Sequence, residues 1–414
     1  MRKRDPRARE AFPFLLALGA AVAVCAPAAA RAQSRLAVLE EPDAVAVGLA
    51  IVLDSGSPRE LDSEAGLTPL AAMAAIEQAR PQLEAIGGRA RVECRAAATV
   101  ITIHLPAATW RLGALLIQDA IFDQRISGEA IERARAELLH TLEAQDPFTA
   151  GLREALAEAL FGDDPRWVRP PCGRPEAIRA LSEADIHRVR DSWFRADRAT
   201  AAIAGPVSAA DARAILSRFA VGADLPPLVP TPATPDRAGR VHVASSTVTT
   251  WLGLAYPFDR DADLEALRLL AFYVRETLAP TAARPDVYDV STTIERHGDG
   301  GWLTISLVTA PATAPDREDE ARALVRETAT PMLADARFDA LIRRYRGVRL
   351  LELASPESRA LEAALDLLFE RRARTTAPLI DDLTPGRLQR AAAGLGAPAA
   401  AVLGPLGSGW AGKP

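Results

Sequence analysis

The side chains best suited to bind a metal or activate water are few and scattered in this chain of 414 residues. His140 and Glu143 lie three positions apart in a helical stretch, which makes them a partial zinc-ligand pair on one helix face. No third ligand follows nearby, so a solvated helix face is the better interpretation. The remaining histidines form no pair of recognisable spacing: His104, His187, His242 and His297.

Motifs for nucleophilic catalysis and phosphate binding are missing as well. The sequence contains no G-x-S-x-G, no phosphate-cradling glycine loop and no Cys–His arrangement of known spacing. Two cysteines, Cys94 and Cys172, remain once a predicted export signal is removed, and an oxidising compartment would allow them to pair. Because two cysteines are not a disulfide framework, we expect two isolated thiols.

The first 32 residues predict a secretory signal. A basic start at residues 2–9 precedes an uncharged apolar run over 11–30, and Ala30-Arg31-Ala32 fits a small-x-small cleavage site. We therefore expect a cleaved signal peptide over 1–32, a periplasmic or secreted protein, and no stable membrane insertion after cleavage. The alternative is a membrane anchor formed by the uncleaved segment, since the apolar run is just long enough to span a bilayer.

The composition of the mature chain limits its partners. Removing the signal takes away six basic and two acidic residues and leaves a net charge of −9. An acidic surface argues against nucleic acid or anionic lipid as a partner. Hydrophobic residues make up 49% of the chain and charged residues 25%, a balance that allows a sizeable globular core.

The elements that would position a site begin with a buried strand over 45–53, which is apolar and rich in valine. A Gly/Ser turn separates it from a helix over 67–79. Pro81 then starts a second helical run to residue 86, and 91–105 contains a strand. The rest of this half is predicted as helices over 112–122, 128–142, 152–160 and 211–219, a helix start capped by Ser182, and a strand over 199–203.

Five prolines between Asp224 and Pro235 predict a stiff linker over 224–237. This linker divides the mature chain into an N-terminal domain over 33–223 and a C-terminal domain over 238–414. Further elements are predicted in the second domain as a hairpin over 287–294 and 302–308, helices over 317–327, 338–353 and 357–371, a helix start at Thr384, and a strand over 401–403.

The second domain repeats the first in outline. Its strand over 249–255 and helix over 264–274 follow the order seen at the start of the first domain. Both domains also end with a helix start, a short strand and a Gly-Pro, at Gly205-Pro206 and Gly404-Pro405. An internal duplication of about 200 residues accounts for this pattern. Each half is then α+β, with a mixed or antiparallel sheet backed by helices.

The order of short motifs in the first half resembles the pitrilysin/insulinase-like metallopeptidases. The turn Asp54-Ser55-Gly56-Ser57 and the helix entry Gly66-Leu67 resemble the start of that family's zinc-site region. Gly87-Gly88, the break at Asp146-Pro147 and the stretch 161–165 follow in the family's order. The second half is similar more weakly. The resemblance implies two homologous peptidase-like halves and a clamshell of four such halves that closes around a peptide.

In that family an inverted zinc motif, H-x-x-E-H, lies on the helix that corresponds to 67–79. Its three positions here are occupied by Pro69, Ala72 and Met73. Proline and alanine side chains cannot bind zinc, and a thioether is a poor ligand for it. The resemblance therefore implies a degenerate zinc motif, with no peptide hydrolysis by this half.

Other family positions are also changed. The third zinc ligand, a glutamate, falls near Leu138 and Leu139, so we expect no metal and no cofactor in this chain. In related peptidases the half opposite the zinc supplies an arginine and a tyrosine that hold the substrate. Tyr288 falls at the tyrosine position, while the arginine position is Thr281 and Arg284 is the nearest substitute. Tyr288 and Arg284 are thus candidate substrate-binding residues, and a packed strand tyrosine is the alternative.

The resemblance implies a non-catalytic subunit of a zinc peptidase complex. Such a subunit would complete a peptide-binding chamber with a related zinc-bearing partner, and zinc would be present only in that partner. The alternative is a stand-alone peptide-binding or structural module without a protease role, which the loss of the arginine at Thr281 favours. An independent zinc peptidase is the least favoured hypothesis, and whether the chain acts as part of an enzyme stays open at this point.

Overall fold

The computed structural model of the chain describes residues 35–162, 164–220, 239–298, 300–330, 335–369 and 382–406. The predicted signal peptide and the whole predicted linker lie outside these residues. Within the described part, no helix combines the length and the apolar character needed to cross a membrane.

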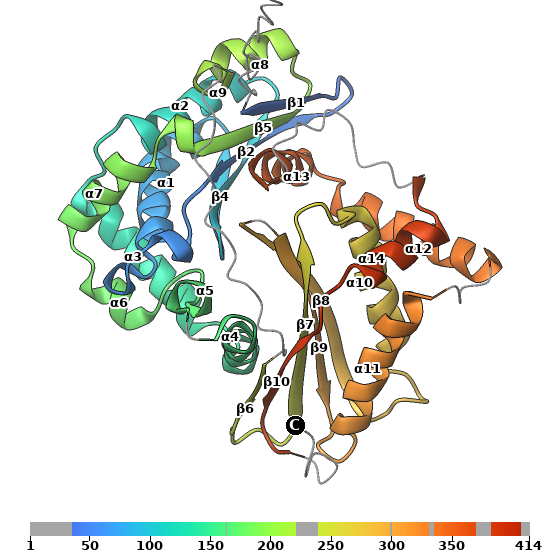
Figure 1. The fold of residues 1–414 in the computed structure, drawn as a ribbon. Coiled ribbons are helices and arrows are strands. Elements are labelled where there is room, and N and C mark those ends of the chain that lie inside the picture. Colours follow the sequence, from blue (N-terminus) through green and yellow to red (C-terminus); the bar gives the residue numbers. More distant parts are fainter. Residues whose placement is uncertain are drawn as a thin grey trace, which may run out of the picture.

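Two five-stranded mixed sheets form the framework (Figure 1). The first has the order β1 (Leu36–Glu40), β5 (Ala199–Gly205), β2 (Ala46–Leu53), β4 (Ala98–Pro106) and β3 (Arg89–Arg95). The second has the order β6 (Arg240–Val243), β10 (Ala399–Leu403), β7 (Thr250–Asp259), β9 (Gly300–Thr309) and β8 (Val287–His297). In each sheet the first pair is parallel and the others are antiparallel. The two halves therefore share one topology, which confirms the predicted α+β fold.

The strands differ from the prediction in two places. The sequence does not indicate β1 and β6. These short edge strands pair only with β5 and β10, which lie more than 150 residues later in the chain. The stretch 91–105 is a hairpin of β3 and β4 rather than one strand. Its turn at Ala96 and Ala97 contains no glycine, asparagine or aspartate, the residues that usually mark a hairpin turn.

Helices of the first half cover one face of the first sheet. Their bounds are α1 (Leu67–Ala85), α2 (Trp110–Phe122), α3 (Gly128–Glu143), α5 (Pro165–Val168), α6 (Pro175–Ala180), α7 (Glu183–Trp193), α8 (Ala209–Ile215) and α9 (Ser217–Ala220). The predicted break at Pro81 is wrong, because α1 continues through it. Ile76, Ala79 and Leu83 are buried on both sides of Pro81, so core packing outweighs the hydrogen bond that proline removes.

The continuous apolar run of β2 is explained by burial of both its faces. Leu49 and Ile51 point into the core that contains α1, whereas Ala50 and Val52 point to the opposite face. That opposite face packs against α13 (Pro356–Phe369), which belongs to the second half (Figure 1).

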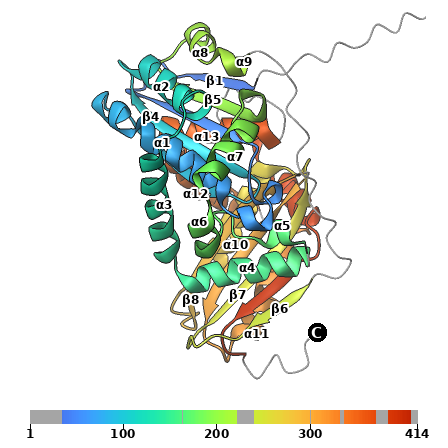
Figure 2. The same ribbon diagram turned by 90° about the vertical axis from the view of Figure 1, so that its left-hand side faces the viewer.

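The second sheet is covered in the same way by a helix from the first half. Its own helices are α10 (Leu264–Leu278), α11 (Ala314–Thr328), α12 (Asp335–Glu352) and α14 (Pro385–Ala393). The other face of this sheet receives α4 (Pro147–Phe161), whose Leu152 and Leu156 lie against Gly253 and Ala255 of β7. Figure 2 shows α4 crossing this sheet. Each half thus supplies the helix that completes the other half's core, and the space between the halves is fixed by both.

Candidate functional site

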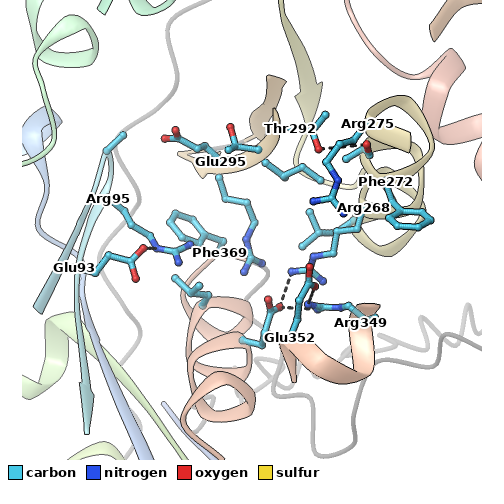
Figure 3. Close-up of a pocket in the computed structure, with 18 of the residues that line it drawn as sticks. Glu93, Arg95, Arg268, Phe272, Arg275, Thr292, Glu295, Arg349, Glu352 and Phe369 are labelled. Atoms are coloured by element: carbon cyan, nitrogen blue, oxygen red, sulfur yellow. Dashed lines mark hydrogen bonds and ion pairs between the residues drawn. The ribbon is translucent and has the colours of Figure 1, made fainter. Parts of the chain in front are cut away.

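Three adjoining cavities lie at or beside the junction of the two halves. Residues of both halves line two of them, and residues of the first half alone line the other. The cavity volumes are about 450, 360 and 260 Å³. Arg153 of α4 and Pro171 line all three, so we treat the cavities as one inter-half groove. We refer to them below as the first, second and third cavity in order of size. The first is walled by β3 on one side and by β8, α10, α12 and α13 on the other (Figure 3).

The first cavity carries more positive than negative side chains. Six arginines and four glutamates of the described chain line it: Arg95, Arg153, Arg268, Arg275, Arg296, Arg349, Glu93, Glu295, Glu352 and Glu362. Figure 3 shows arginines of α10 and α12 on one side of the cavity and Arg95 on the other. These residues lie on several elements from both halves, so only the fold brings them together.

Arg268, Arg349 and Glu362 belong to a buried network that also includes Glu265 and Tyr345. Arg268 contacts Glu265 at 2.9 Å and Glu362 at 2.5 Å, measured between nitrogen and oxygen. Arg349 lies 3.4 Å from each of the same two carboxylates. Tyr345 donates a hydrogen bond to Glu265 at 2.5 Å. Arg349 and Glu265 are both almost fully buried, so each charge depends on the others for compensation.

The pKa of Glu362 shows how strongly the arginines act. Burial by itself favours the neutral carboxylic acid, but Arg268, Arg349 and Arg296 outweigh it and lower the pKa of Glu362 to about 2. Because the folded-state pKa lies below the ordinary value of 4.5, Glu362 stabilises the fold above pH 4.5.

This shift predicts acid sensitivity that depends on one residue. As pH falls from 4.5 towards 2, the wild-type protein should progressively lose roughly 3 kcal/mol that Glu362 contributes. Chemical denaturation measured at a series of pH values would give this slope. The Glu362→Gln variant, which cannot titrate, should be less stable at neutral pH and should have a shallower slope. Identical slopes for the two proteins would contradict the assignment.

Among the described residues, two arginines of the first cavity lack an ion pair. Arg153 and Arg275 form no ion pair anywhere in the described part of the chain. The Arg153 Nε is buried and has no hydrogen-bond partner there, and Arg275 lies over the Phe272 ring at 5.7 Å. Burial raises the pKa of nearby Glu295, and the positive charges of Arg153 and Arg95 oppose this rise. The Glu295 side chain is 34% exposed.

The second cavity is lined by two of the positions that the family resemblance assigns to the zinc site. Met73 of α1 and Leu138 of α3 line it together with edge strand β3, so the fold brings these two predicted positions to one place. Pro69 and Ala72 instead lie buried in the core beneath. Leu139 packs partly buried against the same core. Over the residues with described positions, no group of three or more His, Cys, Asp or Glu side chains is placed to hold a metal ion.

Polar residues of this cavity were missed by the sequence reasoning. Glu77 lies one turn after Met73, and its carboxylate pairs with Arg80. Arg80 also lies 3.3 Å from Glu137, the residue before Leu138. Burial raises the pKa of Glu137, with Arg80 opposing and Glu77 adding to the rise. The i, i+4 spacing from Met73 to Glu77 could have placed Glu77 on the same face of the helix. The contact of Arg80 with Glu137 of α3 could not be predicted, because it depends on the fold.

The other candidate residues lie outside the groove. Tyr288 is 53% exposed at the start of β8, beside a bulge, and lines none of the three cavities. Arg284 pairs with Glu320 at 2.8 Å. The role of both in substrate binding stays a prediction. His140 and Glu143 are exposed, and Glu143 pairs with Arg179 rather than sharing a site with His140.

The remaining histidines lie apart from one another. His104 pairs with Glu357, and His187 lies 3.2 Å from Glu183. His242 contacts the Gly404 carbonyl oxygen at 2.9 Å. His297 is fully buried and stacks on Trp302, and burial lowers its pKa well below the usual value. Each of these rings is therefore engaged by its own surroundings.

Cys94 and Cys172 form a disulfide, so the expectation of two isolated thiols is wrong. Their Cα atoms are 5.3 Å apart, although 78 positions separate them in the sequence. The fold brings them together because Cys94 lies on β3 and Cys172 lies in the segment between α5 and α6. The bond links edge strand β3 to the wall formed by Pro170 and Pro171.

Loss of this disulfide should loosen the groove wall. Cys94→Ser/Cys172→Ser is expected to cost about 2–5 kcal/mol of unfolding free energy, since the bond closes a long loop. Denaturant unfolding of oxidised protein against the double variant would measure the difference. Adding reductant should destabilise the wild type by a similar amount and leave the variant unchanged. A reductant effect on the variant would show that the loss has another cause.

Comparison with known proteins agrees with this geometry. Residues 180–345 match a family model described as the peptidase M16 inactive domain. The structure of a peptidase M16 inactive domain from Pseudomonas fluorescens is similar, with a TM-score of 0.72, 18% identity, and coverage of 89% of this chain and 95% of that one. A protease from Helicobacter pylori matches with a TM-score of 0.72, 14% identity, and coverage of 89% and 96%. No curated protein matches the sequence.

A chain of Complex III2 from Candida albicans is also similar, with a TM-score of 0.69, 12% identity, and coverage of 89% of this chain and 93% of that one. These structural matches show a shared fold, and residues 180–345 are similar to the M16 inactive domain. Together they confirm the resemblance to the pitrilysin/insulinase-like metallopeptidases.

Proposed function

We propose that this protein is a zinc-free subunit that, together with a related zinc-bearing peptidase chain, encloses peptides for cleavage by that partner. The observation that carries the proposal is the second cavity. There α1 and edge strand β3 line the same cavity, while the zinc-motif positions on α1 are occupied by Pro69, Ala72 and Met73, which are not zinc ligands. The scaffold that would present a peptide is kept, and the groups that would cut it are missing.

The edge of the first sheet supports a role in holding peptide. In the described part of the chain, β3 pairs only with β4, so its outer edge is available to an added strand. The groove that borders this edge contains both apolar and charged side chains, as expected for a site that takes an extended peptide. We propose a periplasmic or secreted location for the complex, which the disulfide supports because such bonds persist in oxidising compartments.

The alternative is a peptide-binding module that acts without a peptidase. The exposed position of Tyr288 and the ion pair of Arg284 favour it, because neither residue lies in the groove. In that case the protein would bind peptides alone and would not change the activity of any zinc-bearing chain.

Reconstitution with a zinc-bearing chain distinguishes these functions. The protein should be co-expressed with a related chain that contains H-x-x-E-H, and the mixture analysed by size-exclusion chromatography and peptide hydrolysis. We expect co-elution and hydrolysis that neither chain gives alone. The matched control is the partner with its motif glutamate changed to glutamine, which should co-elute without hydrolysis. Separate elution with unchanged hydrolysis would reject the subunit function and leave the module.

A further inference from the structure

The first cavity has a charge pattern that the proposed function does not explain. Its arginines outnumber its glutamates, and neither Arg153 nor Arg275 forms an ion pair with a side chain of the described chain. A buried Arg153 Nε without an acceptor is costly unless something else supplies one. An arginine guanidinium matches carboxylate geometry particularly well.

The position of this cavity connects it to peptide binding. Glu93 and Cys94 of β3 line both the first and the second cavity, so the same edge strand borders both. A strand added to β3 would pass the apolar side chains of Met73 and Leu138 in the second cavity and reach the arginines of the first. Arg153 also lines the third cavity, whose walls include the apolar rings of Trp251 and Trp302.

We infer that the first cavity binds carboxylate groups of the peptide, so that the protein selects acidic over neutral peptides. This inference rests on the proposed peptide-binding function and names its substrate class. Arg153 and Arg275 are the specificity-determining residues. They line the first cavity and form no ion pair in the described chain, so a ligand carboxylate can pair with them. The arginines of the buried network are already neutralised by Glu265 and Glu362.

Binding of short labelled peptides to the purified protein, measured by fluorescence anisotropy, tests this inference. One peptide alternates valine and glutamate, and a second replaces every glutamate with glutamine. Each is made with a free carboxyl terminus and as an amide, so that side-chain and terminal carboxylates are distinguished. We expect the wild type to bind the glutamate peptide at least about tenfold more tightly than the glutamine peptide.

Variants of the two arginines locate the effect. Arg153→Gln and Arg275→Gln should each weaken binding of the glutamate peptide about tenfold and leave the glutamine peptide unchanged. Arg213→Gln, which changes an exposed arginine of α8 outside the groove, is the matched control and should bind like the wild type. Thermal denaturation should show both groove variants folded, since neither substitution breaks an ion pair within the described chain.

The outcomes separate this inference from the proposed function. Equal affinity of the wild type for glutamate and glutamine peptides would overturn the inference and keep the peptide-binding function. Failure of every peptide to bind would reject peptide binding by the chain itself. Citrate serves as a probe for free carboxylic acids. If citrate binding depends on Arg153 and Arg275 while neither peptide binds, the cavity binds a small carboxylic acid and the assignment of a peptide ligand is wrong.

Discussion

Replacing Arg349 with leucine is expected to lower the free energy of unfolding by about 3–5 kcal/mol, because it leaves buried carboxylates without their counter-charge. Arg349 is only 3% exposed and lies between Glu265, Glu352 and Glu362. Arg268 can still neutralise part of this charge, but Glu265 would lose a partner in a region where water cannot replace it. Urea denaturation followed by circular dichroism would measure the loss.

A surface ion pair provides the control for this variant. Arg111 pairs with Asp211 at 2.6 Å, and both side chains are about half exposed. Arg111→Leu should therefore cost no more than about 1 kcal/mol. Adding Glu265→Leu to Arg349→Leu should recover part of the loss, since the second change removes the unpaired carboxylate. If Arg349→Leu costs no more than Arg111→Leu, the network does not compensate its charges as described.

Replacing Gly48 with alanine should be similarly damaging, at about 3 kcal/mol. A Cβ atom at Gly48 would lie 2.2 Å from the Glu357 backbone nitrogen and 2.3 Å from the Pro356 carbonyl carbon. Both are backbone atoms at the start of α13, so the whole helix must move away from the first sheet. Because α13 comes from the second half, we expect the variant to weaken the contact between the halves and to become more sensitive to protease.

Gly347 is the matched glycine for this test. It lies on the exposed side of α12, and a Cβ atom there would meet no atom within 4 Å. Gly347→Ala should stabilise the protein by about 0.5–1 kcal/mol, because alanine is the better helix former. If Gly48→Ala were as stable as the wild type, α13 would not pack directly against Gly48 of β2.

Because the halves exchange helices, we expect Arg349→Leu and Gly48→Ala to change the groove as well as the stability of the protein. The start of α13 rests on Gly48, and Glu362 of the same helix holds Arg268 and Arg349 at the first cavity. On the other side, α4 packs on the second sheet and carries Arg153 into all three cavities. The groove therefore keeps its shape only while both halves stay docked.

Local sequence patterns were sufficient for the repeated α+β halves and for most helices. Periodicity located α3 and α10 closely, and the cap formed by Ser182 with Asp185 is present as predicted. These signals succeed because they depend on neighbours within a few turns of chain. The family resemblance, rather than periodicity, assigned the zinc-motif positions to Pro69, Ala72 and Met73, whose side-chain chemistry is a property of residue type and needs no structure.

Other features could be known only from the tertiary structure, because they join residues that are distant in sequence. The pairing of Cys94 with Cys172, the edge strands β1 and β6, and the placement of Arg153 between three cavities all arise from long-range packing. Neither the composition nor the spacing around these residues indicates their partners. A local pattern reports which face of an element is apolar, but it does not report which half of the molecule will cover that face.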